Sequence, residues 1–207
     1  MGHMTRALTA KGAATRQRIV AGTTLLVRDR GVGQVSLDDI RAATATSQSQ
    51  LFHYFPDGRA ELLRAVATHE ADQVLYDQQP FLGELGTAES WRAWRDAVVR
   101  KYREQGIHCP LSALTSQLGP TDPKVREIVA DLIRNWHAQI AEGIRRSQKS
   151  RVAATSVEPS AAAGTILAAI QGGVVILLAT GDIRYLETAL DDALAPLDLG
   201  RAAKRRR

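Results

Sequence analysis

Apolar residues recur every three to four positions along most of this chain, which is the spacing that places them on one face of an α-helix. Gly and Pro interrupt the pattern and mark the ends of the helical stretches. The pattern predicts longer helices over residues 13–30, 60–79, 91–105, 123–148, 159–180 and 182–194, and a short one over 111–118. No long stretch of β-branched residues alternates with polar ones as a half-buried strand would, so we predict an all-α fold.

Two shorter helices are predicted between residues 36 and 56, separated by a turn of small residues. Ser36 can cap the first helix by accepting a hydrogen bond from a backbone N–H, and the side chain of Asp39, at the third helical position, can accept one from the backbone N–H of Ser36. Ser47 can cap the second helix, which ends before Pro56. This layout is typical of a helix-turn-helix, whose second helix can lie in the major groove of DNA. A helical hairpin without DNA contact would give the same pattern in this window.

Four short motifs accompany this layout at fixed separations. They are Thr15–Ile19 (TRQRI), Arg30–Gly31, Ser36–Ile40 (SLDDI) and Leu51–Pro56 (LFHYFP). Over residues 14–66 the chain resembles TetR-type transcriptional repressors, which implies a three-helix DNA-binding domain followed by a helical body that binds an effector and dimerises. One departure is Ala45, which stands in the turn where the family usually has Gly with a positive φ, a conformation that costs Ala more.

The charge of the chain is uneven. Residues 1–35 carry six Lys or Arg against one Asp, whereas residues 65–200 carry thirteen against seventeen Asp or Glu. A basic segment beside a helix-turn-helix suits contact with phosphates. We expect the base edges to be read by Gln48, Ser49, Gln50 and His53, and the remaining DNA contacts to come from Lys11, Thr15, Arg16, Ser36, Thr46, Ser47, Tyr54 and Arg59.

Large apolar residues gather in the part of the chain after residue 80, which also holds all three Trp. With a few polar anchors they can surround a ligand cavity, although an ordinary packed core would explain each of them singly. The candidate ligand contacts are Trp91, Trp94, Tyr102, His108, Leu111, Leu114, Gln117, Asn135, Trp136, Ile140 and Ile170. The runs Gly106–Leu111 and Gln171–Gly173 resemble the lincomycin-resistance and flavonoid-responsive subgroup of the same family, which implies an aromatic or drug-like effector.

The stretch from residue 160 to residue 179 carries no charge. A helix that is apolar on all sides must be covered on all sides, here by its own body and by a second copy. The last helix can join it, so that two helices from each chain form a four-helix interface. The expected interface residues are Ile166, Ala169, Gly173, Val174, Leu177, Tyr185, Leu186 and Leu190. The core helix of a monomer is the alternative.

Motifs for catalysis and metal binding are missing from the sequence. It has no His-x-Glu-x-x-His zinc motif, no Gly-x-Ser-x-Gly nucleophile elbow and no Gly-rich phosphate loop, so we expect no enzyme, no cofactor and no metal. Cys109, the only cysteine, fits a reducing cytoplasm, and it can be a redox sensor or a small buried hydrophobe. The first residues lack a secretory pattern, and the longest apolar run, residues 174–179, is too short to span a bilayer, so no membrane partner is expected.

These features divide the chain into five parts. They are a flexible basic arm with an expression-tag scar (1–12), a helix-turn-helix domain (13–58), a connecting helix (59–79), an effector-binding and dimerisation domain (80–197) and a basic disordered tail (198–207). The tail can be a solubilising end or a second, non-specific grip on DNA. We expect a cytoplasmic, ligand-responsive repressor that binds a palindromic double-stranded DNA operator as a homodimer and is released by a small-molecule effector. Constitutive DNA binding without an effector, or a helical carrier or enzyme, are the rival interpretations.

Overall fold

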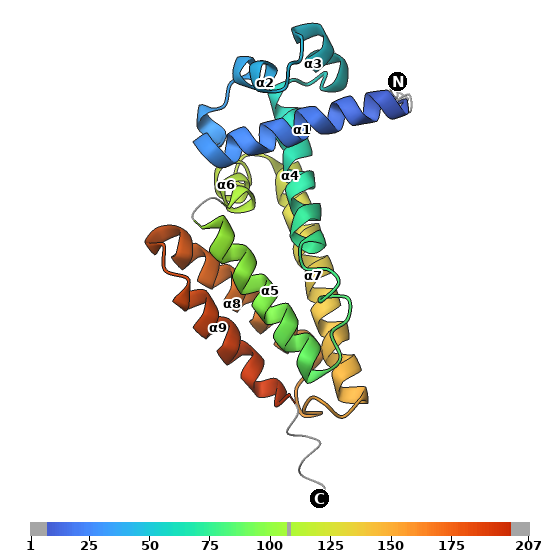
Figure 1. Ribbon diagram of the computed structural model, residues 1–207, viewed down its shortest axis with the longest axis vertical. Helices are drawn as coiled ribbons and strands as arrows, with labels where there is room; N and C mark the ends of the chain where they lie inside the picture. The colour runs from blue at the N-terminus through green and yellow to red at the C-terminus, as the bar shows by residue number, and fades with distance from the viewer. Residues whose placement is uncertain (1–7, 107–108, 200–207) are drawn as a thin grey trace, which may run out of the picture.

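The computed structural model describes residues 8–106 and 109–199, without the side chains at 110, 111, 113 and 114. Every regular element in that part of the chain is a helix, which confirms the all-α prediction. The elements are α1 (Ala10–Arg30), the 3-10 helix η1 (Val32–Gln34), α2 (Leu37–Ala43), α3 (Gln48–Tyr54), α4 (Arg59–Tyr76), α5 (Ala88–Gln105), α6 (Pro110–Gln117), α7 (Pro123–Lys149), α8 (Pro159–Thr180), α9 (Arg184–Leu194) and the 3-10 helix η2 (Ala195–Leu197). Figure 1 shows α1 to α3 as a head at one end of an elongated molecule, with α4 leading from it into a bundle of longer helices.

Local sequence signals explain where the helices begin and end. Thr9 caps α1 by accepting a bond from the backbone N–H of Gly12 (3.2 Å), so the helix begins at Ala10 rather than at residue 13. Asp122 caps α7, and a Pro takes the first helical position, where its missing N–H costs nothing. From residue 200 the predicted basic tail lies outside the described residues.

The head has its own hydrophobic core, and the body contributes to it. Ile40 of α2, Leu51 of α3 and Phe55 are fully buried in this cluster. Val125 of α7 is buried in the same cluster, and Leu118, at the corner between α6 and α7, packs against it. Because dense apolar packing resists local rearrangement, we expect the head to follow a displacement of this corner.

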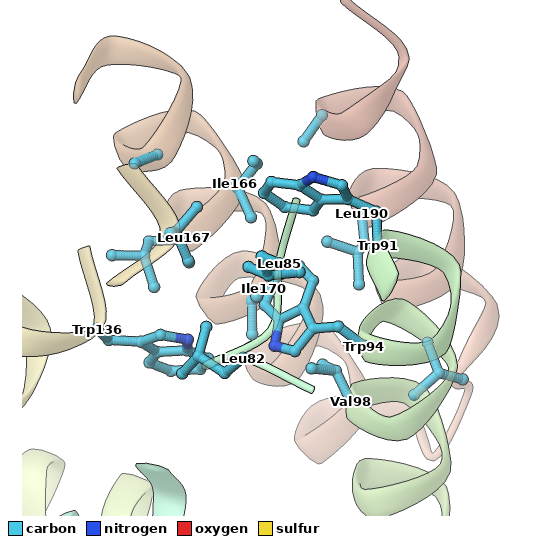
Figure 2. Packing of buried hydrophobic residues seen from close by; sticks show 14 of the residues in the cluster. Leu82, Leu85, Trp91, Trp94, Val98, Trp136, Ile166, Leu167, Ile170 and Leu190 are labelled. Carbon is cyan, nitrogen blue, oxygen red and sulfur yellow. The ribbon is translucent and has the colours of Figure 1, made fainter. Parts of the chain in front are cut away.

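The core of the body is built around three tryptophans, whose rings Figure 2 shows converging with apolar side chains of α8. Trp91, Trp94 and Trp136 are all fully buried. The indole N–H of Trp91 donates to Ser147 Oγ (2.8 Å), and that of Trp94 donates to Gln78 Oε1 (2.9 Å). Buried aromatic rings of this size dominate the packing energy of a core.

The helix α8 is long and apolar enough to cross a membrane by length and composition, with a mean hydropathy of 2.0, and 39% of its most apolar 18 residues are buried. We expected no membrane partner because the longest unbroken apolar run, residues 174–179, is too short to span a bilayer. The whole helix is a longer apolar segment, since the Gly, Ser, Thr and Gln residues that interrupt its apolar residues carry no charge. The core helix of a soluble protein can be equally long and apolar, and α8 packs against both α7 and α9.

Candidate nucleic-acid interface and effector pocket

The start of α2 is fixed by the predicted capping box. The backbone N–H of Asp39 donates to Ser36 Oγ (3.1 Å), and the backbone N–H of Ser36 donates to the Asp39 carboxylate (2.9 Å). The hydrogen bonds from Ser36 hold the pKa of Asp39 below its ordinary value. Arg30 lies 3.2 Å from the same carboxylate and ties α2 to the end of α1.

The turn between α2 and α3 is closed by two buried threonines. Thr44 Oγ1 donates to the Ile40 carbonyl (2.7 Å), and Thr46 Oγ1 donates to the Thr44 carbonyl (3.1 Å). Thr46 is only 5% exposed, so its side chain closes the turn and does not face a phosphate as we expected. Ala45 has a φ of 46°, so it adopts the left-handed conformation of the Gly that it replaces, at a cost in free energy.

The helix α3 buries one face and exposes the other. Ser47 caps it by accepting a bond from the backbone N–H of Gln50 (3.2 Å), and Leu51 anchors the inner face with no exposed surface. The outer face presents Gln48, Ser49, Phe52 and His53, with Gln50 half-buried at its edge. Phe52 was absent from the predicted contacts, yet it is 40% exposed on this face. In Figure 1, α3 lies at the outer end of the head, away from the body.

The start of α1 lies beside the end of α3. The Arg16 guanidinium lies 5.0 Å above the ring of Phe55, a cation–π contact that holds it close to α3. The hydroxyl of half-buried Tyr54 approaches α1 at Gly12, where an added Cβ would lie 3.6 Å from it. Lys11, one residue before Gly12, is exposed. Three of the expected DNA contacts are therefore brought to one edge of the head.

Arg59 has a different position from the one that we expected. Its Nε donates to the Val35 carbonyl (3.0 Å), and its Nη2 donates to the Val32 carbonyl, so the guanidinium holds the linker between α1 and α2. Arg59 is therefore a positioning residue of the head, since two of its donors face backbone carbonyls and not solvent. Sequence alone gives no signal for this role, because the carbonyls lie 24 and 27 residues away.

Two ion pairs hold α4 to its neighbours. Arg28 of α1 contacts both carboxylate oxygens of Glu70 (3.1 and 3.2 Å), and the Glu70 side chain is 4% exposed. Arg64 Nε lies 2.7 Å from the Asp122 carboxylate at the start of α7. Burial raises the pKa of Asp122, but hydrogen bonds from Arg64 and from backbone N–H groups outweigh burial, so the pKa lies below its ordinary value.

A pocket of about 610 Å³ opens among α5, α6, α7 and α8. Its described lining consists of Tyr102, Cys109, Ser112, Thr115, Ser116, Val129, Ile133, Gln171, Val174, Val175, Leu178 and Ala179. Burial, reinforced by Cys109, raises the pKa of Tyr102, so its hydroxyl stays neutral and can donate a hydrogen bond. Among the lining residues that the structure describes none is a Lys, Arg, Asp or Glu, so the pocket suits an uncharged, mostly apolar ligand with hydrogen-bonding groups.

Only Tyr102 among the predicted ligand contacts lies in the described lining of this pocket. The structure places Trp91, Trp94, Trp136, Ile140 and Ile170 in the packed core of the body. Gln117 and Asn135 are exposed. His108 and the side chains of Leu111 and Leu114 lie outside the described residues. Ser112 and Gln171 line the pocket but were absent from the predicted contacts. Ser112 carries no sequence signal, whereas Gln171 stands in the run Gln171–Gly173 that carries the resemblance to the subgroup.

Most of the predicted dimer residues are covered by their own chain. Ile166, Gly173, Val174, Leu177, Leu186 and Leu190 are buried, whereas Ala169 is half-buried and Tyr185 is 52% exposed. A Cβ on Gly173 would lie 2.5 Å from Leu186 Cα, so this Gly serves the contact of α8 with α9 in one chain. Between its two ends, α8 instead exposes Ala168, Gly172, Val175, Ile176 and Ala179, while Ser160, Ala161, Thr165 and Thr180 are exposed nearer the ends.

Comparison with known proteins agrees with this geometry. Residues 87–192 match the family model for the C-terminal domain of LmrA/YxaF-like transcriptional regulators. An HTH-type transcriptional regulator of Lactococcus lactis is 26% identical over 184 residues, which cover 86% of this chain and 90% of that protein. Another, of Mycobacterium tuberculosis, is 29% identical over 124 residues; the match covers 57% of this chain and only 59% of that relative. The fold matches the crystal structure of a TetR-family transcriptional regulator from Cytophaga hutchinsonii with a TM-score of 0.79 at 18% identity, over 92% of this chain and 98% of that one.

Proposed function

This chain belongs to the TetR family of transcriptional regulators, and we propose that it is a repressor that binds a palindromic DNA operator as a homodimer and is released by a small effector. Its relatives are named as transcriptional regulators, so the chain is a regulator of transcription and not an enzyme. One observation carries the proposal: Leu51 locks the inner face of α3 into the head, while the outer face presents polar side chains to solvent.

In the proposed complex α3 enters the major groove. Gln48, Ser49 and His53 reach base edges from the exposed face, and Gln50 reaches them from its edge. Phe52 adds an apolar surface that suits the methyl group of thymine. The phosphate contacts come from Lys11, Thr15, Arg16, Ser36, Ser47 and Tyr54.

Dimerisation is proposed through the exposed faces of α8 and α9, including Val175 and Tyr185. A two-fold dimer reads a two-fold operator, with half-sites separated by about 34 Å, one turn of the duplex. We further propose that the chain works in the cytoplasm without a membrane partner, and that α8 is covered by a second copy.

The effector is proposed to bind in the pocket among α5 to α8, as an uncharged aromatic or drug-like compound. Ser112 of α6 lines this pocket, while Leu118, just after α6, packs against the head core. The next residues supply the Asp122–Arg64 ion pair to α4. An effector that binds better when α6 is displaced therefore changes the position of the head, through its differential affinity for the two states.

Selection of bound duplexes from a random pool tests this function. The wild type should enrich an inverted repeat, the Gln48→Ala, His53→Ala double variant should enrich none, and the control Arg92→Ala, on an exposed side chain of α5, should behave as the wild type. Aromatic compounds added to the complex should release the duplex. Enrichment that no compound affects would favour constitutive binding, and no retained DNA would favour a helical carrier.

A further inference from the structure

The mouth of the effector pocket lies on the exposed face of α8. Val175 lines the pocket yet is 62% exposed, and Ala179, also in the lining, is exposed one turn further along the helix. The deeper lining differs, because Val174 is 2% exposed and Tyr102 is 9% exposed. One wall of the pocket is therefore an open, apolar rim.

The same exposed face of α8 continues into a groove that it shares with α9, which we name the α8–α9 groove. This groove has a volume of about 760 Å³, and Ala168, Gly172 and Ile176 line it from α8. Tyr185, 52% exposed, lines it from α9. No residue from 160 to 180 carries a charge, and a continuous exposed apolar surface of this kind marks an interaction site.

The charges on α9 identify a second copy of the chain as the occupant of the α8–α9 groove. Arg184, Thr188 and Asp192 all line the groove and follow one another at intervals of one helical turn. When two α9 helices pack antiparallel about Thr188, Arg184 of each chain faces Asp192 of the partner subunit, which makes the surface complementary to itself. Arg184 is 83% exposed and donates to both carboxylate oxygens of Asp182, whose side chain is 26% exposed, so a second carboxylate can approach the guanidinium from the solvent side. A lipid surface would match the apolar residues but not this charge pattern.

We propose that the partner subunit forms the outer wall of the effector pocket, so that each effector site is complete only in the dimer. The proposal rests on the proposed function for the pocket and the dimer, and it states where the two meet. Val175 lies on the same exposed face as Gly172 and Ala179, so a chain seated on the α8–α9 groove also covers the rim of the pocket. Effector binding and dimerisation then strengthen each other by linkage.

The reactivity of the only cysteine of the chain measures how far this wall closes the pocket, and the measurement does not require the natural effector. Cys109 lines the pocket, and its rate of reaction with N-ethylmaleimide, which is small and uncharged, measures access. The variants Arg184→Asp and Asp192→Arg each place like charges together across the two-fold axis, and their combination restores the opposite pair. Neither residue lines the pocket. Sedimentation velocity gives the mass of each variant, and circular dichroism confirms its helical content.

The wild type and the combined variant should be dimers that react slowly and bind Nile red, an uncharged planar dye. Each single variant should be a folded monomer that reacts about tenfold faster and binds Nile red about tenfold more weakly. Monomers with the reaction rate and dye affinity of the wild type would overturn the proposal, because the pocket would be closed within one chain. Dimeric single variants would also overturn it, since the chains would not meet along α9. A wild type that is monomeric or does not bind Nile red would instead contradict the proposed function.

Discussion

The substitution Arg59→Ala tests whether the Arg59 side chain holds the linker between α1 and α2 or contacts a DNA phosphate. The substitution removes two hydrogen bonds to the carbonyls of Val32 and Val35, residues that are 3% and 2% exposed. Leaving buried carbonyls without a donor costs about 1–3 kcal/mol, so we expect the free energy of unfolding to fall by about 2 kcal/mol. For a chain of this size that loss lowers Tm by about 4–8 °C. Arg59→Lys keeps the charge but not the planar fork, so it should lose most of the same stability.

Thermal unfolding at fixed protein concentration and DNA-binding anisotropy across a range of salt concentrations test this role of Arg59. The slope of log affinity against log salt should match that of the wild type, because the guanidinium faces carbonyls and not the duplex. Arg92→Ala is the control, since its side chain is 71% exposed on α5 and should change neither quantity. An unchanged Tm with a slope smaller by about 0.9 would instead show that Arg59 contacts a phosphate.

Four further substitutions test the packing of α8, the turn before α3 and the capping of α7. Gly173→Ala should lower the free energy of unfolding by about 1–3 kcal/mol in urea titrations, because its Cβ would lie 2.5 Å from the backbone of α9. Gly164→Ala is the matched control: its Cβ meets nothing within 4 Å, so the free energy of unfolding should rise by about 0.5–1 kcal/mol. Changes of the same sign in the two variants would contradict the packing of α8 on α9. Ala45→Gly should raise it by about 0.5–1 kcal/mol by relieving a φ of 46°, and a loss would show that the turn is unstrained. Burial raises the pKa of Asp122, but its hydrogen bonds lower the pKa below the ordinary 3.8. The ionised carboxylate therefore stabilises the fold above pH 3.8, and this stabilisation is lost as the pH falls through the pKa of the folded state. The stability difference between the wild type and Asp122→Asn should therefore be constant near neutral pH and shrink in acid, whereas a difference that persists in acid would point to another cause.

The helix-turn-helix could be predicted from sequence because its signals are local. The capping residues Ser36 and Ser47 lie beside the helices that they cap, and Pro56 follows the C-cap residue of α3. Contacts between distant segments carry no such signal. Thr46 and Arg59 are polar residues near a predicted DNA surface, and only the fold shows that their side chains are committed to backbone carbonyls.

The faces of α8 could not be assigned from sequence for a different reason. The helix is apolar all round, so periodicity cannot separate Val174, which is 2% exposed, from Val175, which is 62% exposed. The apolar character therefore predicts a covering partner, but most of the residues chosen for that contact are buried within their own chain. The large apolar residues of the body gave the same difficulty, since a Trp in a packed core and a Trp in a ligand pocket look alike in sequence.

Site-specific photocross-linking shows whether α3 enters the major groove. A photoreactive label is attached through Ser49→Cys in a Cys109→Ser background, which leaves one thiol, on the outer face of α3. With a selected duplex, the label at position 49 should link to bases at two positions about 34 Å apart, while the same label attached through Arg92→Cys should link to none. A duplex that is bound but not linked from position 49, or that is linked equally well from position 92, would contradict the account.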